Sequence, residues 1–325
     1  MSFRRHDKIG LALGSGAARG LAHIGVLKVL EEERVPLAAI AGTSIGALIG
    51  ALYAAGVPVA QMEEIARDVD WRDLARLVNP VFFGAGLIDG KKVASFIAGL
   101  LPVRSFDELR IPFAVTATDV ETGEDVFIKQ GDLVEAVCAA IAFPGIFTPV
   151  RFGDRFLVDG GLCNPVPVDL ARELGSDKVI GVCAIPEIST PHRETFLEPT
   201  QKVKIPGSWR ELFTAERVER LFRDIWRGGE RPPQGPENST AKGRKSPGLL
   251  KIFAQSIAIM ENQINDLRLA QNHLDLLLRP QFDNFNLFEF NRAGEAIRAG
   301  ELEARSKLPA ILEMCPTDCK RCDPC

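Results

Sequence analysis

Short apolar runs alternate with longer amphipathic stretches along residues 8–185. The runs are typical of buried strands, and apolar residues spaced three and four apart are typical of helices with one buried face. We expect strands over 9–13, 37–41, 113–118, 125–129, 156–158 and 179–184. We expect helices over 19–33, 47–55, 59–78, 133–142 and 167–174. Alternating strands and helices indicate an α/β fold whose parallel or mixed sheet is covered on both faces.

The pattern changes after residue 186. Residues 209–227 place aromatic and aliphatic side chains at helical spacing with arginines on the opposite face. Such a helix docks on a core, lies on a lipid surface or covers an apolar site as a lid, and the pattern leaves these alternatives open. Residues 228–248 are rich in Pro, Gly and basic residues, which predicts a flexible linker. Helical periodicity returns over 249–278.

These changes divide the chain into four expected segments. They are a core at 8–185, a variable insertion at 186–248, a helical segment at 249–312 that packs on the core, and a tail at 313–325 that is rich in Cys. The 325 residues, 46% of them hydrophobic and 25% charged, suffice for a large α/β domain with a full core.

The net charge and the hydropathy pattern limit the partners and the cellular compartment that we expect. The formal net charge of -4 gives no sign of a nucleic-acid partner. The apolar run near the N-terminus is too short for a secretory leader, and the most apolar long stretch, 37–57, is interrupted by a Gly-rich turn. We therefore expect a cytoplasmic protein, with peripheral contact to the inner membrane face left open. The sequence gives no oligomeric state.

A candidate nucleophile lies in the motif Gly42-Thr43-Ser44-Ile45-Gly46. Gly-x-Ser-x-Gly places a serine on a sharp strand-to-helix turn and exposes its hydroxyl. A short apolar run precedes the motif and an Ala-rich helix pattern follows it, which fits this geometry. Ser44 would then lie at a helix N-terminus, where the positive end of the helix dipole favours developing negative charge. The alternative is a Gly-rich turn that only packs closely.

The base for Ser44 is not an obvious histidine. The chain has four, His6, His23, His192 and His273, and none stands in a loop at the end of a strand. Asp159 closes an apolar strand and opens the turn Gly160-Gly161, so its carboxylate can project into a site. Partial burial would raise its pKa and its proton affinity. The alternative for Asp159 is an ordinary Asp-Gly turn.

The segment GSGAARG at residues 14–20 is a candidate anion site. Glycines let backbone N–H groups converge at the start of a helix. A dinucleotide fingerprint fails because its third glycine would fall on Arg19, and a phosphate-binding P-loop fails because no Gly-Lys-Ser/Thr follows. What remains is an anion-stabilising loop with an adjacent arginine.

The seven cysteines fall into two groups. Cys138, Cys163 and Cys183 stand alone in apolar contexts and are expected to be small buried side chains. The other four crowd the C-terminus: Cys315, Cys319, Cys322 and Cys325. Such a cluster can hold zinc or an iron–sulfur centre, or form a redox-active tail without metal, and the spacing leaves both open.

Taken together, three blocks resemble the patatin-like phospholipases. They are GSGAARG followed by LAHIGVL at 14–27, GTSIG at 42–46 and DGG at 159–161, in the order of that family. Thr118-Asp119, the segment 122–124 and FPGIFTPV at 143–150 resemble its bacterial members. The resemblance covers 8–185, continues weakly through 249–312 and leaves 192–248 and the Cys tail unexplained.

The resemblance implies a fold, a site and an activity. It implies a three-layer αβα fold with a mostly parallel central sheet flanked by helices. It implies a Ser44–Asp159 dyad, an oxyanion hole at Gly14, Ser15 and Gly16, and hydrolysis of phospholipid or lysophospholipid esters without metal or cofactor. Arg19 would contact an anion or a lipid head group.

The sequence departs from the family at three places: Ser15 and Ala17 stand where many relatives have glycine, and Ala140 where serine is frequent. Two other functions stay open. One is a carboxylesterase or thioesterase that does not act at a membrane, and the other is a regulatory scaffold that keeps the fold.

Overall fold

The computed structural model describes residues 7–68, 90–185, 249–283, 285–287 and 289–315. The chain forms two compact units, residues 1–186 with 260–325 and residues 187–259. The first unit contains the sheet and every predicted site residue. Of the second unit only residues 249–259 are described, and the amphipathic stretch 209–227 lies outside the described residues.

The first unit is built on one eight-stranded sheet with the order β5-β6-β3-β2-β1-β7-β8 and with β4 paired to β3. The strands are β1 (Ile9–Leu13), β2 (Leu37–Thr43), β3 (Phe113–Asp119), β4 (Asp125–Ile128), β5 (Val150–Phe152), β6 (Arg155–Asp159), β7 (Lys178–Val182) and β8 (Leu276–Leu278). The adjacent strands β3, β2, β1, β7 and β8 pair in parallel. β4 and β6 pair antiparallel with β3, and β5 pairs antiparallel with β6. β1 is buried at all five positions, because a central strand has helices over both faces.

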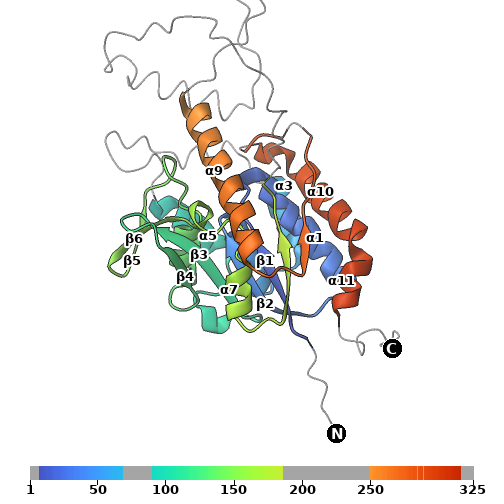
Figure 1. Ribbon diagram of the computed structural model, residues 1–325. Helices are drawn as coiled ribbons and strands as arrows, with labels where there is room; N and C mark the ends of the chain where they lie inside the picture. The colour runs from blue at the N-terminus through green and yellow to red at the C-terminus, as the bar shows by residue number, and fades with distance from the viewer. Residues whose placement is uncertain (1–6, 69–89, 186–248, 284, 288, 316–325) are drawn as a thin grey trace, which may run out of the picture. The chain divides into compact units, whose positions relative to one another are not determined.

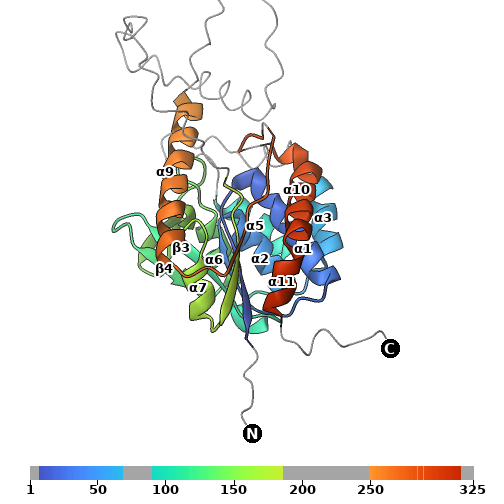
Figure 2. The same cartoon turned by 45° about the vertical axis from the view of Figure 1, so that its right-hand side comes forward.

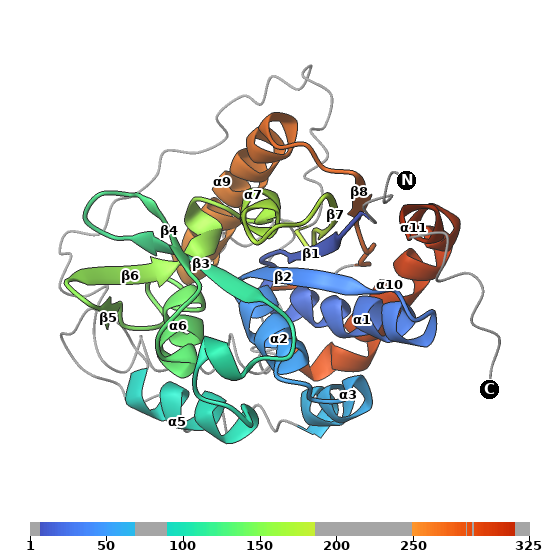
Figure 3. The same ribbon diagram turned by 90° about the horizontal axis from the view of Figure 1, so that it is seen from below.

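Helices cover both faces of this sheet, as Figure 3 shows from below. α7 (Val168–Glu173) and α9 (Leu249–Gln271) from residue 260 onward lie on one side. The other side carries α1 (Ala22–Glu32), α2 (Ile45–Ala54), α3 (Val59–Asp68), α5 (Gly90–Leu100), α6 (Leu133–Ala140) and α10 (Ala293–Ser306). α11 (Leu308–Met314) follows α10, and Figures 1 and 2 show the helices on either side of the sheet. This is the three-layer arrangement expected from the sequence.

α10 packs directly on α1, although the two helices are far apart in the sequence. A Cβ on Gly25 would lie 1.9 Å from the carbonyl oxygen of Ile297, and a Cβ on Gly300 would lie 1.9 Å from that of Ala22. The two backbones therefore approach more closely than any larger residue allows. Lys28 adds an ion pair across this contact, since its Nζ lies 2.8 Å from Glu301 Oε1.

Most predicted elements occur within a few residues of their expected bounds, but two differences are informative. The helical stretch predicted to 278 ends at Gln271, and Leu276–Leu278 form β8, which extends the sheet beside β7. Three consecutive leucines are compatible with a helix or with a strand. They form a strand here because β7 has a free edge with which they pair. α5 and β5 have no counterpart in the sequence prediction. Among the described residues, no helix combines the length and the apolar content needed to cross a membrane.

Candidate active site

Ser44 occupies a strained turn between β2 and α2. Its backbone has φ 55° and ψ −127°, a left-handed conformation that costs a non-glycine residue about 1–3 kcal/mol. The flanking glycines make the turn possible. A Cβ on Gly42 would lie 2.5 Å from Ala47 Cα, and a Cβ on Gly46 would lie 2.2 Å from the carbonyl oxygen of Leu13. The Gly-x-Ser-x-Gly spacing is therefore a steric requirement of this strand–turn–helix.

Asp159 ends β6 and contacts the Ser44 side chain. The Ser44 hydroxyl donates to Asp159 Oδ2 at 2.6 Å, and the Gly161 N–H donates to Oδ1 at 2.8 Å. The Asp159 backbone is fixed as well, because its N–H donates to the Ala142 carbonyl at 3.0 Å and its carbonyl accepts from the Thr118 hydroxyl at 3.0 Å. The carboxylate therefore points at Ser44 in one defined orientation.

The sheet explains why two residues 115 positions apart meet. Thr43, the last residue of β2, pairs with Thr116 of β3, and Ala117 of β3 pairs with Asp159. The hydroxyl groups of Thr43 and Thr116 lie 3.0 Å apart, and Thr43 Oγ1 donates to the Asn164 carbonyl at 2.8 Å. These bonds join the turn after β2 to the turn after β6, directly beside the two site residues.

Burial changes the acid strength of Asp159. The residue is 1% exposed, and this burial, opposed by the hydrogen bonds from Ser44 and Gly161, raises its pKa to about 6. A carboxylate in this range is still mainly ionised at neutral pH and binds a proton more strongly than an exposed one. The Ser44 hydroxyl therefore lies within hydrogen-bond distance of a carboxylate that is more basic than an exposed one.

The comparisons with known proteins identify the family of this domain. The model of the family "Patatin-like phospholipase" matches residues 11–172, which include both Ser44 and Asp159. The chain carries a patatin-like phospholipase domain. An uncharacterized NTE family protein of Mycobacterium tuberculosis is 29% identical to it over 332 residues, which cover 94% of this chain and 92% of that protein.

Two further matches concern part of the chain and its fold. The patatin-like phospholipase domain-containing protein 6 of Homo sapiens is 33% identical over 183 residues, which cover 54% of this chain and 13% of that protein. The crystal structure of VipD from Legionella pneumophila matches with a TM-score of 0.50 and 11% identity, over 95% of this chain and 67% of that chain. This last match concerns the fold alone.

The loop at residues 14–20, which is predicted to form the oxyanion hole, has other free N–H donors than expected. The Gly14 N–H donates to the Val182 carbonyl at 3.0 Å and the Ser15 N–H to the Pro165 carbonyl at 2.8 Å. This corrects the expectation for Gly14 and Ser15, because both amides are already engaged. Within the described residues the amides of Gly16 and Ala17 make no hydrogen bond. The free backbone N–H donors of this loop are therefore those of Gly16 and Ala17, and a role of Gly16 in an oxyanion hole stays a prediction.

Ala17 departs from glycine at a position where glycine is favoured. Its φ is 49°, in the left-handed region. This conformation turns the chain at the start of η1 (Ala17–Leu21), a short 3-10 helix that leads into α1. Because Ala17 has a methyl group, this conformation is more strained than it would be for glycine.

His23 supports this loop from behind. Its Nε2 donates to the Gly14 carbonyl at 2.7 Å, and the ring is completely buried. Burial lowers the pKa of His23 to about 4, so the ring is neutral and the Nε2 atom carries the proton.

Arg19 has a contact within the protein. Its Nε donates to the Phe285 carbonyl at 3.0 Å, and its Nη2 donates to the same oxygen. The guanidinium thus ties η1 to the segment before α10. A contact between Arg19 and an anion or head group stays a prediction.

The turn after Asp159 rests on a polar network that the sequence analysis missed. The Asn164 amide donates to Asp125 Oδ2 at 3.0 Å and to Asp169 Oδ1 at 2.8 Å. Arg268 of α9 lies 3.2 Å from the Asp125 carboxylate and 3.4 Å from that of Asp169, and its Nε donates to the Cys163 carbonyl at 3.0 Å. This network anchors the segment that carries the candidate base.

Glu261 of α9 is a second missed residue. Its side chain belongs to a buried polar face with Asn262 and Asn265, and Glu261 is 7% exposed. Its Oε1 would lie 2.5 Å from a Cβ placed on Gly161, so it reaches the turn that holds Asp159. Polar residues repeated at helical spacing were the available signal, but nothing in the sequence says which face of α9 meets the site.

The cysteines give a mixed result. Cys138 and Cys183 are buried as expected, but Cys163 is only half-buried and its thiol donates to the Gly123 carbonyl at 3.2 Å. Cys315 is buried at the end of α11, whereas Cys319, Cys322 and Cys325 lie outside the described residues. Among the described residues no group of three or more His, Cys, Asp or Glu side chains is placed to hold a metal ion. A metal site in the tail stays a prediction.

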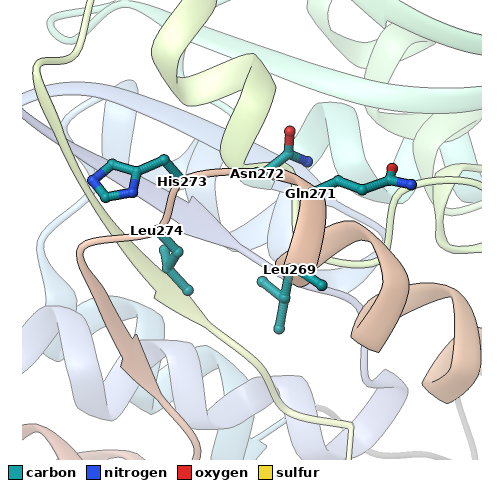
Figure 4. Close-up of a pocket in the computed structure, with 6 residues that line it drawn as sticks. Leu269, Gln271, Asn272, His273 and Leu274 are labelled. Carbon is teal, nitrogen blue, oxygen red and sulfur yellow. The ribbon is translucent and has the colours of Figure 1, made fainter.

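A surface hollow where α9 ends is separate from these residues. Residues 269–274 line it, and Figure 4 shows their side chains around the end of the helix. The His273 side chain is 82% exposed. Neither Ser44 nor Asp159 contributes to this hollow, so it is not part of the candidate active site.

Proposed function

We propose that the protein is a serine acyl hydrolase that cleaves fatty-acyl ester bonds of phospholipids or lysophospholipids. One observation supports this most strongly: the Ser44 hydroxyl donates to the buried Asp159 carboxylate at 2.6 Å, at a strained turn within a patatin-like domain. The class of substrate follows from the family. Because such substrates reside in lipid assemblies, peripheral contact with a lipid surface belongs to the same proposal.

In the first proposed step Asp159 Oδ2 takes the proton of the Ser44 hydroxyl as Oγ attacks the ester carbonyl carbon. The carbonyl oxygen becomes an oxyanion, to which the N–H groups of Gly16 and Ala17 donate. When the intermediate collapses, the bond to the alcohol breaks and the departing alcohol takes the proton from Asp159. The fatty-acyl group is then covalently attached to Ser44.

The second step regenerates the enzyme. Asp159 takes a proton from a water molecule, whose oxygen attacks the acyl carbon, and the resulting oxyanion binds to the same amides. Collapse breaks the bond to Ser44 Oγ, which recovers its proton from Asp159, and the fatty acid departs. These steps use only water and groups of the chain.

The test compares the full chain with Ser44→Ala and Asp159→Asn on lysophospholipid micelles, phospholipid vesicles and p-nitrophenyl esters of increasing chain length. We expect both variants to lose activity by at least about 10³-fold while their circular dichroism is retained. Ser95→Ala is the matched control, because this exposed hydroxyl on α5 donates to the Lys91 carbonyl of its own helix. Full activity in Ser44→Ala would refute the mechanism.

The same measurements separate the alternatives. Turnover of short soluble esters without turnover of lipids would indicate a carboxylesterase or thioesterase. A folded protein that hydrolyses no ester would instead favour the scaffold function.

A further inference from the structure

A second carboxyl group lies beside the candidate base. Glu261 Oε1 and Asp159 Oδ1 would lie 2.5 Å and 3.2 Å from one point, the position that a Cβ on Gly161 would occupy. The two acidic side chains therefore flank the same glycine from α9 and from β6. Gly161 leaves the space in which these carboxyl groups approach each other.

The surroundings of Glu261 do not stabilise a negative charge. Its side chain is 7% exposed, and in the described part of the chain it has neither a hydrogen bond nor an ion pair. Among the described residues the ionisable group that faces it is Asp159. The Ser15 side chain, whose hydroxyl has no hydrogen-bond partner in that part of the chain, lies 3.3 Å from the same Cβ position on Gly161. Burial raises the pKa of Glu261 to about 8, and the negative charge of Asp159 makes a smaller contribution in the same direction.

Two buried carboxyl groups this close do not both ionise readily. At neutral pH the ionised partner is Asp159, whose charge two hydrogen bonds stabilise, and Glu261 keeps its proton. The site then carries one negative charge. If Glu261 also ionises, the second charge opposes the oxyanion that forms when Ser44 attacks the substrate.

We propose that Glu261 is a second ionisable residue of the site, and that the proton it carries is required for turnover. This inference rests on the proposed hydrolase function. No hydrogen bond of the described residues joins Glu261 to Ser44; Glu261 influences the site through its charge, which acts on Asp159 and on the oxyanion. Activity should then rise as Asp159 loses its proton and fall as Glu261 loses its own, and the two coupled groups produce a bell-shaped pH profile.

The experiment measures kcat/KM for a soluble ester from about pH 5 to about pH 10 in the wild type and in Glu261→Gln. In the wild type we expect activity to fall about 10-fold between the neutral plateau and one pH unit above the pKa of Glu261. In Glu261→Gln, whose side chain resembles the protonated acid, this alkaline fall should be absent. Asp266→Asn is the matched control, since Asp266 lies on an exposed part of the same helix and should keep the wild-type profile.

Two outcomes would overturn the inference while the hydrolase proposal stands: a wild type without an alkaline fall in activity, or a Glu261→Gln profile that superimposes on that of the wild type. If no ester is hydrolysed at any pH, the proposed function fails instead. The ionisation of Glu261 is then measured directly by NMR of its carboxyl carbon in the wild-type protein. A pKa near that of an ordinary glutamate would refute the inference irrespective of activity or of how the variant folds.

Discussion

The candidate base is expected to lower the stability of the fold. Burial raises the pKa of Asp159 from 3.8 to about 6, so the folded protein disfavours its ionised form relative to the unfolded chain. Asp159→Asn removes this charge and keeps both side-chain contacts, because an amide oxygen accepts from Gly161 and the amide nitrogen donates to Ser44 Oγ. The variant should therefore be more stable than the wild type at neutral pH.

The size of the expected gain in stability follows from the shift in the pKa of Asp159. One pKa unit corresponds to about 1.4 kcal/mol, so a rise of roughly two units costs the ionised native state about 3 kcal/mol. Imperfect amide hydrogen bonds reduce the expected gain to about 2 kcal/mol. Because the folded pKa lies above the unfolded one, the gain is complete above the folded pKa of about 6. It declines as the pH falls and vanishes below the unfolded pKa, where the wild-type carboxyl is protonated in both states.

The assay is urea unfolding of the wild type and Asp159→Asn at several pH values between about 5 and about 8, followed by circular dichroism. Activity is measured on the same samples. We expect a variant that has lost its activity and gained stability, with a gain that shrinks toward acid pH. A variant less stable than the wild type at the highest pH, or a difference independent of pH, would refute the assigned burial cost.

Three further predictions concern the scaffold and are read by the same unfolding assay. Gly46→Ala should lower the free energy of unfolding by about 3 kcal/mol, because the added Cβ would meet the Leu13 carbonyl at 2.2 Å. Gly99→Ala, in a helix with nothing within 4 Å, is its control and should raise stability by about 0.5–1 kcal/mol; equal effects at both positions would contradict the steric argument. Arg268→Ala should cost about 2 kcal/mol, since it leaves two aspartates without their cation, and an unchanged midpoint would show that the network contributes little. Ala17→Gly should raise the free energy of unfolding by about 1 kcal/mol by relieving a positive φ, and an unchanged or lower value would contradict the strain assigned to Ala17.

The sequence was most informative where the chemistry is local. Ser44 and Asp159 each stand at the end of an apolar strand beside glycines, so the strand, the turn and the exposed side chain can be predicted from a few neighbouring residues. The resemblance to patatin-like phospholipases then predicted that the two turns meet. β2 pairs in parallel with β3, and β6 pairs antiparallel with the carboxyl half of β3, so Asp159 lies opposite Ala117, beside the residue that pairs with Thr43; this is why the two turns meet.

Other features depend on contacts that no local pattern reveals. The amides of Gly14 and Ser15 are engaged because carbonyl groups from Val182 and Pro165 approach the loop. The position of Glu261 depends on which face of α9 meets the turn at 161. The leucines at 276–278 continue a helical pattern in the sequence but form a strand, because they pair with the edge of β7 in the folded protein.

The most direct test of the central claim is to locate the activated serine chemically. The folded full chain is treated with a fluorophosphonate, and the modified residue is identified by mass spectrometry of its peptides, with Ser44→Ala treated in parallel. The account predicts one covalent adduct, on Ser44, that is absent from the variant and whose formation slows below the pKa of Asp159. Labelling at a different serine, or equal labelling of the variant, would contradict it.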